Sequence, residues 1–371
     1  MSFKIFVNPN KSAVESLPPR DPKVRAFHAS LPHYKQTTLV SISAVARELG
    51  IGHLLLKDES SRFGLPAFKI LGASWATSRA IIKKLHLILD DVKPRERLQT
   101  LAIAAQAAHL TLYAATDGNH GRAVSRMAKY LGVEARIFVP RMLDKEAKSN
   151  IESEGAVIEV FDGDYDQTVL ATKLAAEKHE DGKGLLISDV ALETGDEIPG
   201  WIVDGYQTMF DEIEEQVFDI TGRHAITHVV TPVGVGSLAQ AVVAHFRRLP
   251  GFEETQIITV EPTTAACLKT SLEAGEITSV DATYTICTGM CCGTVSVDAW
   301  HLLKAGVDVS VTVDDDEVHK AVLELQIYDV WAGPCGAASL AGLRHLVGTG
   351  FLAAGPDTVI VILCTEGKRS Y

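Results

Sequence analysis

A lysine inside an apolar run is the first residue whose type and position point to chemistry. Lys69 lies in the run Ala-Phe-Lys-Ile-Leu at residues 67–71, after the largely polar stretch 57–66. An unpaired ammonium is costly to bury, and burial lowers the pKa of a lysine toward the neutral amine that attacks carbonyl carbons. The alternative is a lysine that lies along an amphipathic helix and reaches solvent. Lys69 alone does not decide between these two interpretations.

A second stretch, residues 115–121, reads Ala-Thr-Asp-Gly-Asn-His-Gly and joins an apolar run to a helical pattern. Such a turn places backbone N–H groups and short polar side chains at a helix N-terminus, where they suit a phenolate or a carboxylate. Asp117 has a simpler interpretation as the N-cap of that helix.

The third stretch, residues 232–237, reads Pro-Val-Gly-Val-Gly-Ser, follows an apolar strand and opens a helix. Its amides and the helix dipole can hold a phosphate. It lacks the third glycine of the dinucleotide fingerprint, and no Lys-Ser or Lys-Thr of a nucleotide P-loop follows. The stretch therefore predicts a phosphate contact without naming the ligand.

The elements that must position these stretches alternate in type along the chain. From about residue 99, short apolar runs alternate with helical patterns, which predicts βαβ units, parallel sheets and an α/β fold. This order predicts a small domain, residues 73–195, inserted into a larger domain formed by residues 1–72 and 196–371. Strands are expected at 135–139, 156–160, 227–231, 256–260 and 358–363, and helices at 117–131, 145–154, 166–179, 201–216 and 237–248.

The composition limits the classes of partner. The 371 residues are 46% hydrophobic, and their formal net charge is −12. An acidic chain lacks the attraction that dominates binding to nucleic acids and anionic membranes, so neither partner is expected. Its apolar stretches are far shorter than the roughly 20 residues that cross a bilayer, and its first residues lack an apolar signal segment. The cytoplasm is therefore the expected location.

The six cysteines are expected to be free thiols, because a chain without a signal segment favours reduced cysteine. Cys291 and Cys292 are adjacent rather than spaced as Cys-x-x-Cys, and no matching histidine pair lies nearby. No metal site is predicted.

Taken together and in this order, the three stretches resemble the fold-type II pyridoxal-phosphate enzymes, the tryptophan synthase β-like class that includes threonine dehydratases and cysteine synthases. The resemblance covers roughly residues 35–368 and is nearest to the diaminopropionate ammonia-lyase subfamily. Two segments are similar to the sequence motifs of that subfamily: residues 57–69 and the turn Thr-Asp-Gly-Asn-His-Gly-Arg at 116–122. The dehydratases usually have Ser-Ala-Gly-Asn-His in this turn, so Asp117 favours the lyase. The implied fold has two parallel-sheet domains with the cofactor in the cleft between them.

The resemblance implies how the cofactor, pyridoxal 5′-phosphate, is held. Lys69 is expected to carry it as a Schiff base, and Asn119 is expected to hydrogen-bond its phenolic oxygen. The residues expected to hold its phosphate are Gly234, Val235, Gly236 and Ser237.

The remaining roles are implied in the same way. The hydroxyl of Thr365 is expected to meet the ring nitrogen, with Cys364 as the alternative. Asp117 and Asp189 are expected to divide proton abstraction and binding of the substrate's β-ammonium. Cys267, Cys291 and Cys292 are expected to lie on loops of the large domain near the site entrance. Oxidation that joins Cys267 to Cys291 or Cys292 is an added hypothesis against the expectation of free thiols.

The implied activity is β-elimination of ammonia from a small amino acid, best matched by 2,3-diaminopropionate, in a homodimeric enzyme that releases pyruvate and ammonia. Two alternatives stay open. An enzyme that dehydrates serine or threonine, or replaces a β-substituent, would keep the cofactor, whereas a ligand-binding protein would keep only the fold. The turn 333–336 and the loop 289–293 differ from the subfamily's wording and have no assigned role.

Overall fold

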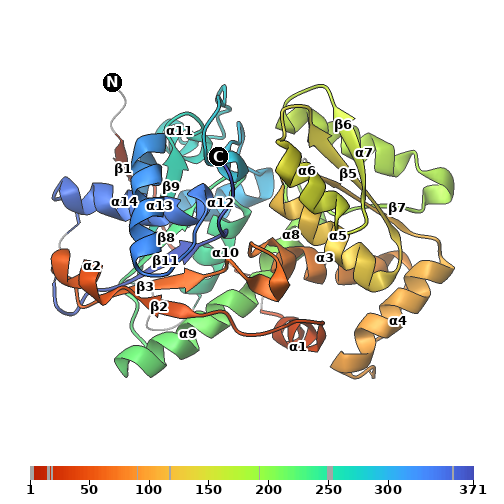
Figure 1. Ribbon diagram of the computed structural model, residues 1–371, viewed down its shortest axis with the longest axis horizontal. Coiled ribbons are helices and arrows are strands. Elements are labelled where there is room, and N and C mark those ends of the chain that lie inside the picture. Colours follow the sequence, from red (N-terminus) through yellow and green to blue (C-terminus); the bar gives the residue numbers. More distant parts are fainter. Residues whose placement is uncertain are drawn as a thin grey trace.

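Two sheets flanked by helices make up the molecule, which confirms the expected α/β class (Figure 1). The computed structural model describes residues 4–14, 17, 20–89, 91–116, 118–191, 193–248, 254–352 and 355–371. The described strands are β1 (Ile5–Val7), β2 (Leu39–Ser41), β3 (His53–Asp58), β4 (Thr111–Ala115), β5 (Glu134–Pro140), β6 (Val157–Phe161), β7 (Gly184–Leu186), β8 (His228–Pro232), β9 (Gln256–Pro262), β10 (Val309–Val313) and β11 (Val359–Cys364).

None of the helices in these described ranges is long and apolar enough to cross a membrane. Three short 3-10 helices are described, namely η1 (Arg62–Gly64), η2 (Glu180–Gly182) and η3 (Thr288–Met290). The described α-helices are α1 (Lys23–Ser30), α2 (Ser43–Glu48), α3 (Lys69–Lys84), α4 (Pro94–Ala107), α5 (Asn119–Leu131), α6 (Lys145–Glu152), α7 (Tyr165–Glu177), α8 (Glu197–Gly205), α9 (Gln207–Thr221), α10 (Ser237–Phe246), α11 (Cys267–Ala274), α12 (Val297–Gly306), α13 (Asp315–Ile327) and α14 (Pro334–Gly348).

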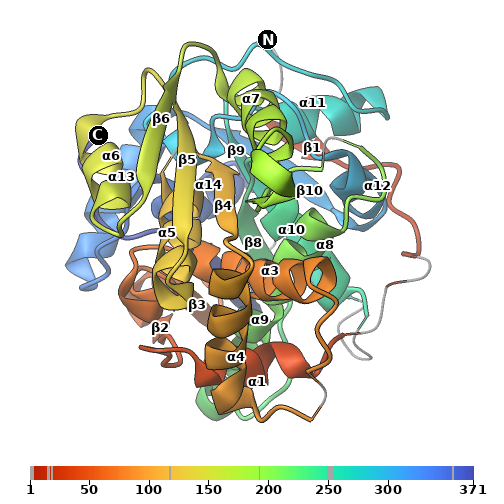
Figure 2. The ribbon, with the colours of Figure 1, turned by 90° about the vertical axis from the view of Figure 1, so that its right-hand side faces the viewer.

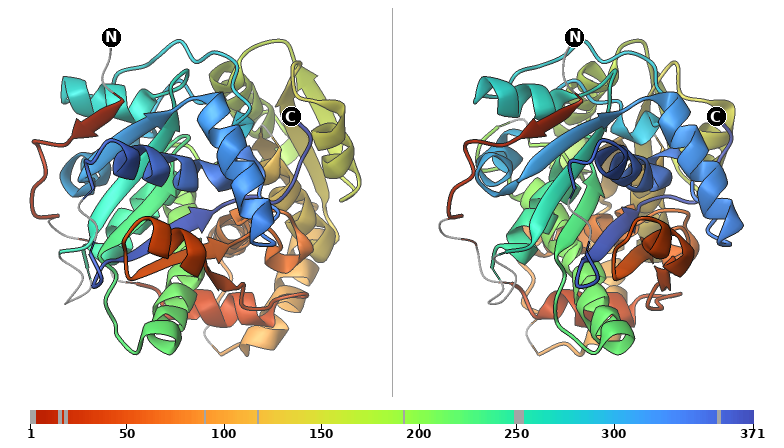
Figure 3. Two further views of the ribbon diagram at one scale, coloured as in Figure 1. Left: turned by 60° about the vertical axis from the view of Figure 1, so that its left-hand side comes forward. Right: turned by 90° about the vertical axis from the view of Figure 1, so that its left-hand side faces the viewer.

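The large sheet has seven described strands in the order β1-β10-β9-β8-β11-β3-β2. Its five central strands are parallel, and β1 and β2 are antiparallel edges. Strand β11 is buried along its whole length, as parallel strands covered on both faces are. Its alternate residues enter two different hydrophobic cores, because successive side chains of a strand point to opposite faces. One of these faces is covered by α13 and α14 (Figure 3).

The small sheet has four described strands, all parallel, in the order β6-β5-β4-β7. Helices α5 and α7 pack against its strands, and α4 packs against α5 (Figure 2). Every strand of this sheet lies between residues 111 and 186, whereas the large sheet takes its strands from residues 5–58 and 228–364. Domain boundaries at 73 and 195 stay a prediction.

Helix α3 connects the two sheets, because it packs against α8 and also against α5 of the small sheet. The α3–α8 crossing depends on two glycines. A Cβ at Gly72 would lie 2.8 Å from the carbonyl oxygen of Ile202, and one at Gly205 would lie 2.5 Å from that of Leu71. The two helices approach this closely only because neither glycine has a side chain.

Most predicted elements lie within a few residues of the observed ones, but the helix expected at 201–216 is wrong. The chain forms α8 and then α9, with a break at Tyr206. The side chain of Tyr206 is fully buried, and its ring centroid lies 4.9 Å from that of Phe68. Packing against α3, which no local sequence pattern reveals, explains the break.

Candidate active site

One cavity lies where strands of both sheets end. The segments that follow the carboxyl ends of β4, β7, β8 and β11 all line it, as expected for ligand sites in parallel sheets. The cavity brings together eight of the nine residues expected from the sequence: Lys69, Asn119, Asp189, Gly234, Val235, Gly236, Ser237 and Thr365. The ninth, Asp117, lies outside the described residues.

Lys69 is the first residue of α3, and its Nζ donates a hydrogen bond to Oδ2 of Asp189 over 2.6 Å. Burial lowers the pKa of Lys69, but the charge and hydrogen bond of Asp189 outweigh burial and raise this pKa above its usual value. The expectation of a lowered pKa is therefore wrong for the protein without cofactor. It failed because it considered burial without a partner carboxylate.

Asp189 lies among three other polar groups of the cavity and is almost fully buried. Burial raises its pKa, but the charge and hydrogen bond of Lys69 outweigh burial and hold the pKa of this carboxyl far below its usual value. The hydroxyl of Tyr165 donates to Oδ1 over 3.5 Å, and Nδ1 of His120 lies 3.9 Å from Oδ2. Because Nε2 of His120 contacts the carbonyl oxygen of Ile187 at 2.8 Å, that nitrogen carries the proton and Nδ1 is a bare acceptor.

The turn before α5 is held by Thr116, whose Oγ1 accepts the backbone N–H groups of Gly118 and Gly121, each over 2.9 Å. Gly118 has φ +137°, a conformation that favours glycine. Asn119 then opens α5, and its Nδ2 donates to Oε2 of Glu366 over 2.9 Å. The turn thus presents a side-chain amide to the cavity.

The loop after β8 exposes backbone donors. Gly236 has φ +97° and Ser237 begins α10, so this loop lies at the positive end of a helix. No described residue accepts the backbone N–H of Gly234, Val235 or Gly236. A Cβ at Gly234 would lie 2.9 Å from the carbonyl oxygen of Gly289, so a larger residue there would fill the space beside these donors.

The two residues considered for the ring nitrogen differ in position. Thr365 lines the cavity, and its carbonyl oxygen accepts the backbone N–H of Phe68 over 3.4 Å, beside Lys69. Cys364 is fully buried in β11, and its thiol donates to the carbonyl oxygen of Glu366 over 3.6 Å. Cys364 therefore belongs to the core of the large sheet, which favours Thr365 for contact with a ligand.

All six cysteines are described, and none forms a disulfide. Cys267 is fully buried, and its thiol donates to the carbonyl oxygen of Gly234 over 3.6 Å. Burial raises the pKa of Cys267. Both features oppose the oxidation hypothesis for Cys267.

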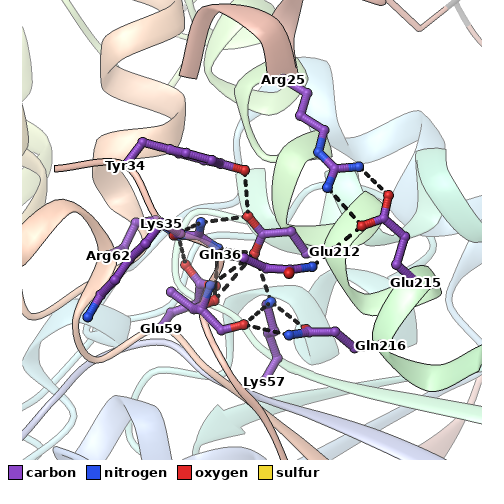
Figure 4. Close-up of polar contacts among 11 residues, drawn as sticks. Arg25, Tyr34, Lys35, Gln36, Lys57, Glu59, Arg62, Glu212, Glu215 and Gln216 are labelled. Carbon is purple, nitrogen blue, oxygen red and sulfur yellow. Dashed lines mark hydrogen bonds and ion pairs between the residues drawn. The ribbon is translucent and has the colours of Figure 1, made fainter. Parts of the chain in front are cut away.

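A buried network of charges lies at the segment that precedes α3 in the chain (Figure 4). Lys57, Glu59, Arg62 and Glu212 have no exposed side-chain surface. Arg62 donates to both oxygens of Glu59, over 2.6 and 2.8 Å, and to both oxygens of Glu212, over 2.7 and 2.8 Å. Lys57 donates to Glu212 over 2.8 Å. The network joins β3, η1 and α9.

This network changes the meaning of the first motif. Lys57, Glu59 and Arg62 belong to the stretch that carried the resemblance, yet they lie in the network rather than in the cavity. Between them and Lys69, Phe63 has φ +54°, which is unusual for a residue with a side chain. The motif therefore holds a strained loop and presents Lys69 at its end.

Sequence reasoning missed several groups of the cavity, which include Glu366, Tyr165, His120, Cys335 and Arg369. Cys335 lies in the turn 333–336, which had no assigned role, and Cys292, named only as an oxidation partner of Cys267, lies in the loop 289–293. The differences of these two segments from the subfamily's sequence motifs could have indicated that they line the cavity. Tyr165, on α7, had none, because only the tertiary fold brings it beside Asp189.

The chain belongs to the pyridoxal-phosphate dependent enzyme family, whose model matches residues 30–365. Its sequence is 34% identical to the diaminopropionate ammonia-lyase of Salmonella typhimurium over 297 residues, which is 79% of this chain and 72% of that enzyme. Identity to the Escherichia coli enzyme is 31% over 362 residues, or 92% of this chain and 87% of that protein. The predicted family is thereby confirmed.

The fold agrees with solved structures of the same relative. The Escherichia coli diaminopropionate ammonia-lyase in complex with an aminoacrylate-PLP azomethine reaction intermediate superposes with a TM-score of 0.84 at 28% identity, covering 98% of this chain and 93% of that one. Its complex with D-serine gives a TM-score of 0.86 at 29% identity, with the same coverage. A threonine deaminase from Solanum lycopersicum, at 20% identity and a TM-score of 0.73, shares the fold.

The cavity residues fit the family's cofactor. The N–H groups of Gly234, Val235 and Gly236, which no described residue accepts, form a cradle for a phosphate at the start of α10. Lys69 offers the amine that an aldehyde requires, and Asn119 and Thr365 offer an amide and a hydroxyl to a polar ring. The predicted cofactor, pyridoxal 5′-phosphate, therefore agrees with both the family and the geometry.

Proposed function

We propose that this chain eliminates ammonia from a small α-amino acid with an amine at Cβ, with 2,3-diaminopropionate as its substrate and pyruvate and ammonia as products. The carrying observation is the 2.6 Å pair between Lys69 and Asp189 in a cavity that also holds the glycine loop and Asn119. The similarity to diaminopropionate ammonia-lyases over 92% of this chain supports the choice of substrate.

In this proposal Lys69 binds the cofactor covalently, the loop 234–237 holds its phosphate, Asn119 contacts its phenolic oxygen and Thr365 contacts its ring nitrogen. When bound, pyridoxal phosphate withdraws electrons from the substrate's Cα and so allows the Cα proton and the β-substituent to leave. Lys69 and Asp189 lie side by side and can exchange a proton with the substrate. A neutral hydroxyl at the ring nitrogen favours loss of the β-substituent over long storage of negative charge on the ring.

Asp117 and Asp189 divide the remaining work. A β-amine leaves readily only as an ammonium, and a neighbouring carboxylate favours that charged form. The low pKa of Asp189 keeps it anionic at neutral pH. Asp117 precedes Asn119 by two residues in the sequence. The resemblance gives dehydratases a small neutral residue at this position, and Asp117 is the second carboxylate of the proposal.

The test is a substrate screen that measures keto-acid and ammonia release. Turnover of both enantiomers of 2,3-diaminopropionate, with little turnover of serine or threonine, supports the proposal. Preferred turnover of serine or threonine would favour a dehydratase, and consumption of an added nucleophile would favour β-replacement. Bound cofactor without turnover of any amino acid would favour a ligand-binding protein.

Asp189→Asn is expected to change cofactor attachment and catalysis in opposite directions. Loss of the partner charge leaves burial to lower the pKa of Lys69, so more neutral amine is present at pH 8. Stopped-flow absorbance should show attachment to the apoprotein at least about tenfold faster, since one pKa unit is a factor of ten in protonation, while kcat falls. Glu193→Gln, which removes an exposed carboxylate that pairs with Lys173, is the matched control and should change neither rate.

Asp117→Asn keeps the size of the side chain but removes the carboxylate. The proposal expects kcat on 2,3-diaminopropionate to fall by at least roughly a hundredfold while the cofactor still attaches. Steady-state turnover of each enantiomer measures this fall, and the two aspartate variants should lose different enantiomers if the carboxylates face opposite sides of Cα. Near-normal kcat on both would exclude Asp117 from catalysis and reopen the dehydratase interpretation.

The proposal also includes a cytoplasmic homodimer whose small domain spans residues 73–195. Support for the domain boundaries comes from the alternating element order and from the small sheet, whose strands all lie between residues 111 and 186. Light scattering of the purified protein tests the dimer, and limited proteolysis followed by mass mapping tests the boundaries.

A further inference from the structure

Glu366 is a buried carboxylate in the cavity whose two oxygens have different partners. Glu366 is 3% exposed. Oε1 accepts the backbone N–H of Cys335 over 3.0 Å, and Oε2 accepts Nδ2 of Asn119 over 2.9 Å. With both oxygens bound, the carboxylate has a single orientation.

The turn Gly333-Pro-Cys-Gly336 is shaped around this residue. A Cβ at Gly333 would lie 2.8 Å from Oε1 of Glu366, and one at Gly336 would lie 2.4 Å from its carbonyl oxygen. Helix α14 begins at Pro334, so its positive end points at the carboxylate. The charges of Arg369 and Glu366 also attract one another. The turn 333–336, to which the sequence analysis assigned no role, thus positions the Glu366 carboxylate beside Asn119.

An ionised carboxylate has no hydrogen to donate and can only accept hydrogen bonds. The orientation of the Asn119 amide beside Glu366 is therefore determined by Glu366. Nδ2 must face Glu366, which leaves its second hydrogen to point elsewhere. Without Glu366 the amide could rotate by 180° and present Oδ1 in place of Nδ2. This choice decides whether Asn119 donates to an anionic oxygen or repels it.

We propose that Glu366 is a positioning residue that fixes the Asn119 amide as a hydrogen-bond donor to the anionic phenolic oxygen of the cofactor. The inference rests on the proposed function, because that function places the phenolic oxygen beside Asn119. A hydrogen bond to an anion favours the anionic form. An Asn119 amide in this orientation therefore keeps the phenolic oxygen of the bound cofactor deprotonated down to a lower pH.

The experiment compares Glu366→Gln, Asn119→Ala and the double variant as cofactor-loaded proteins. Gln keeps the size of Glu366, but its amide can pair with either Nδ2 or Oδ1 of Asn119. The readouts are the pH at which the visible absorption of the bound cofactor changes and the cofactor's dissociation constant. Glu366→Gln is expected to raise that pH and to weaken cofactor binding about tenfold, the range for loss of one hydrogen bond. In the Asn119→Ala background it should change neither quantity further.

Equal effects of Glu366→Gln in both backgrounds, or no shift in the single variant where Asn119→Ala does shift, would overturn the inference and leave the proposed function intact. Wild-type protein without a visible cofactor band would overturn both. A second variant, Glu366→Asp, keeps the charge but is too short to reach both Asn119 and Cys335, and it should shift the same band. Thermal unfolding of the wild-type apoprotein and the four variants separates a change at the cofactor from a loss of folding.

Discussion

Lys69→Ala is expected to abolish covalent attachment of pyridoxal phosphate and to lower kcat by at least about 10²–10⁴-fold, the range for loss of a positioned proton-transfer group. The expectation follows from the position of Lys69 at the start of α3, with its Nζ in the cavity and 2.6 Å from Asp189. Borohydride reduction of the loaded protein, followed by peptide mapping, should find the reduced cofactor on Lys69 in the wild type and on no residue in the variant.

Lys173→Ala is the matched control for this experiment. Lys173, on α7, pairs with Glu193, and the side chain of Lys173 has 29% exposure. Its replacement should leave attachment and kcat unchanged. Cofactor mapped to a lysine other than Lys69 in the wild type would refute the assignment of the whole site.

Glu212→Gln is expected to lower the free energy of unfolding by about 3–5 kcal/mol, because it leaves the charges of Lys57 and Arg62 buried with one carboxylate fewer. Neither cation can reach solvent, since their side chains have no exposed surface. Urea unfolding followed by circular dichroism measures the change. Glu215→Gln, also on α9, removes an exposed partner of Arg25 and should cost only about 0–1 kcal/mol.

The same glutamate gives the wild-type protein a defined acid response. Burial raises the pKa of Glu212, but Arg62 and Lys57 outweigh burial and bring it from 4.5 to about 2. A lowered folded-state pKa contributes stability that is complete above the unfolded value and is lost as the pH falls toward 2. Wild-type stability should therefore fall between about pH 5 and pH 2 more steeply than that of Glu212→Gln, and equal slopes would contradict the ion pairing.

The sequence predicts those parts of the fold that depend on local pattern. Strands β5, β6, β8, β9 and β11 were expected within one or two residues, because each is a short apolar run between turn residues. The division into α8 and α9 was not predicted, because it follows from the packing of Tyr206 on Phe68. The antiparallel edge β1 has three residues, too few for any period to identify.

The candidate site divides in the same way. Lys69, Asn119 and the loop 234–237 lie in short, distinctive stretches, so the sequence alone identified them, and the cavity brings them together. The pairing of Lys69 with Asp189, 120 residues away, reverses the pKa direction that burial alone predicts. Glu366 reaches Asn119 across 247 residues of chain. Contacts of this kind depend on how the two sheets are placed, which no local pattern contains.

The buried charge network restricts how this chain can change over evolution. Loss of Glu59, Arg62 or Glu212 alone strands a charge in the protein interior, so each single step away from the network passes through a poorly folded intermediate. Replacement of the whole set by apolar residues avoids that cost. Related sequences should therefore either keep these positions together or exchange them together, and positions 59, 62 and 212 should covary strongly although they lie outside the cavity.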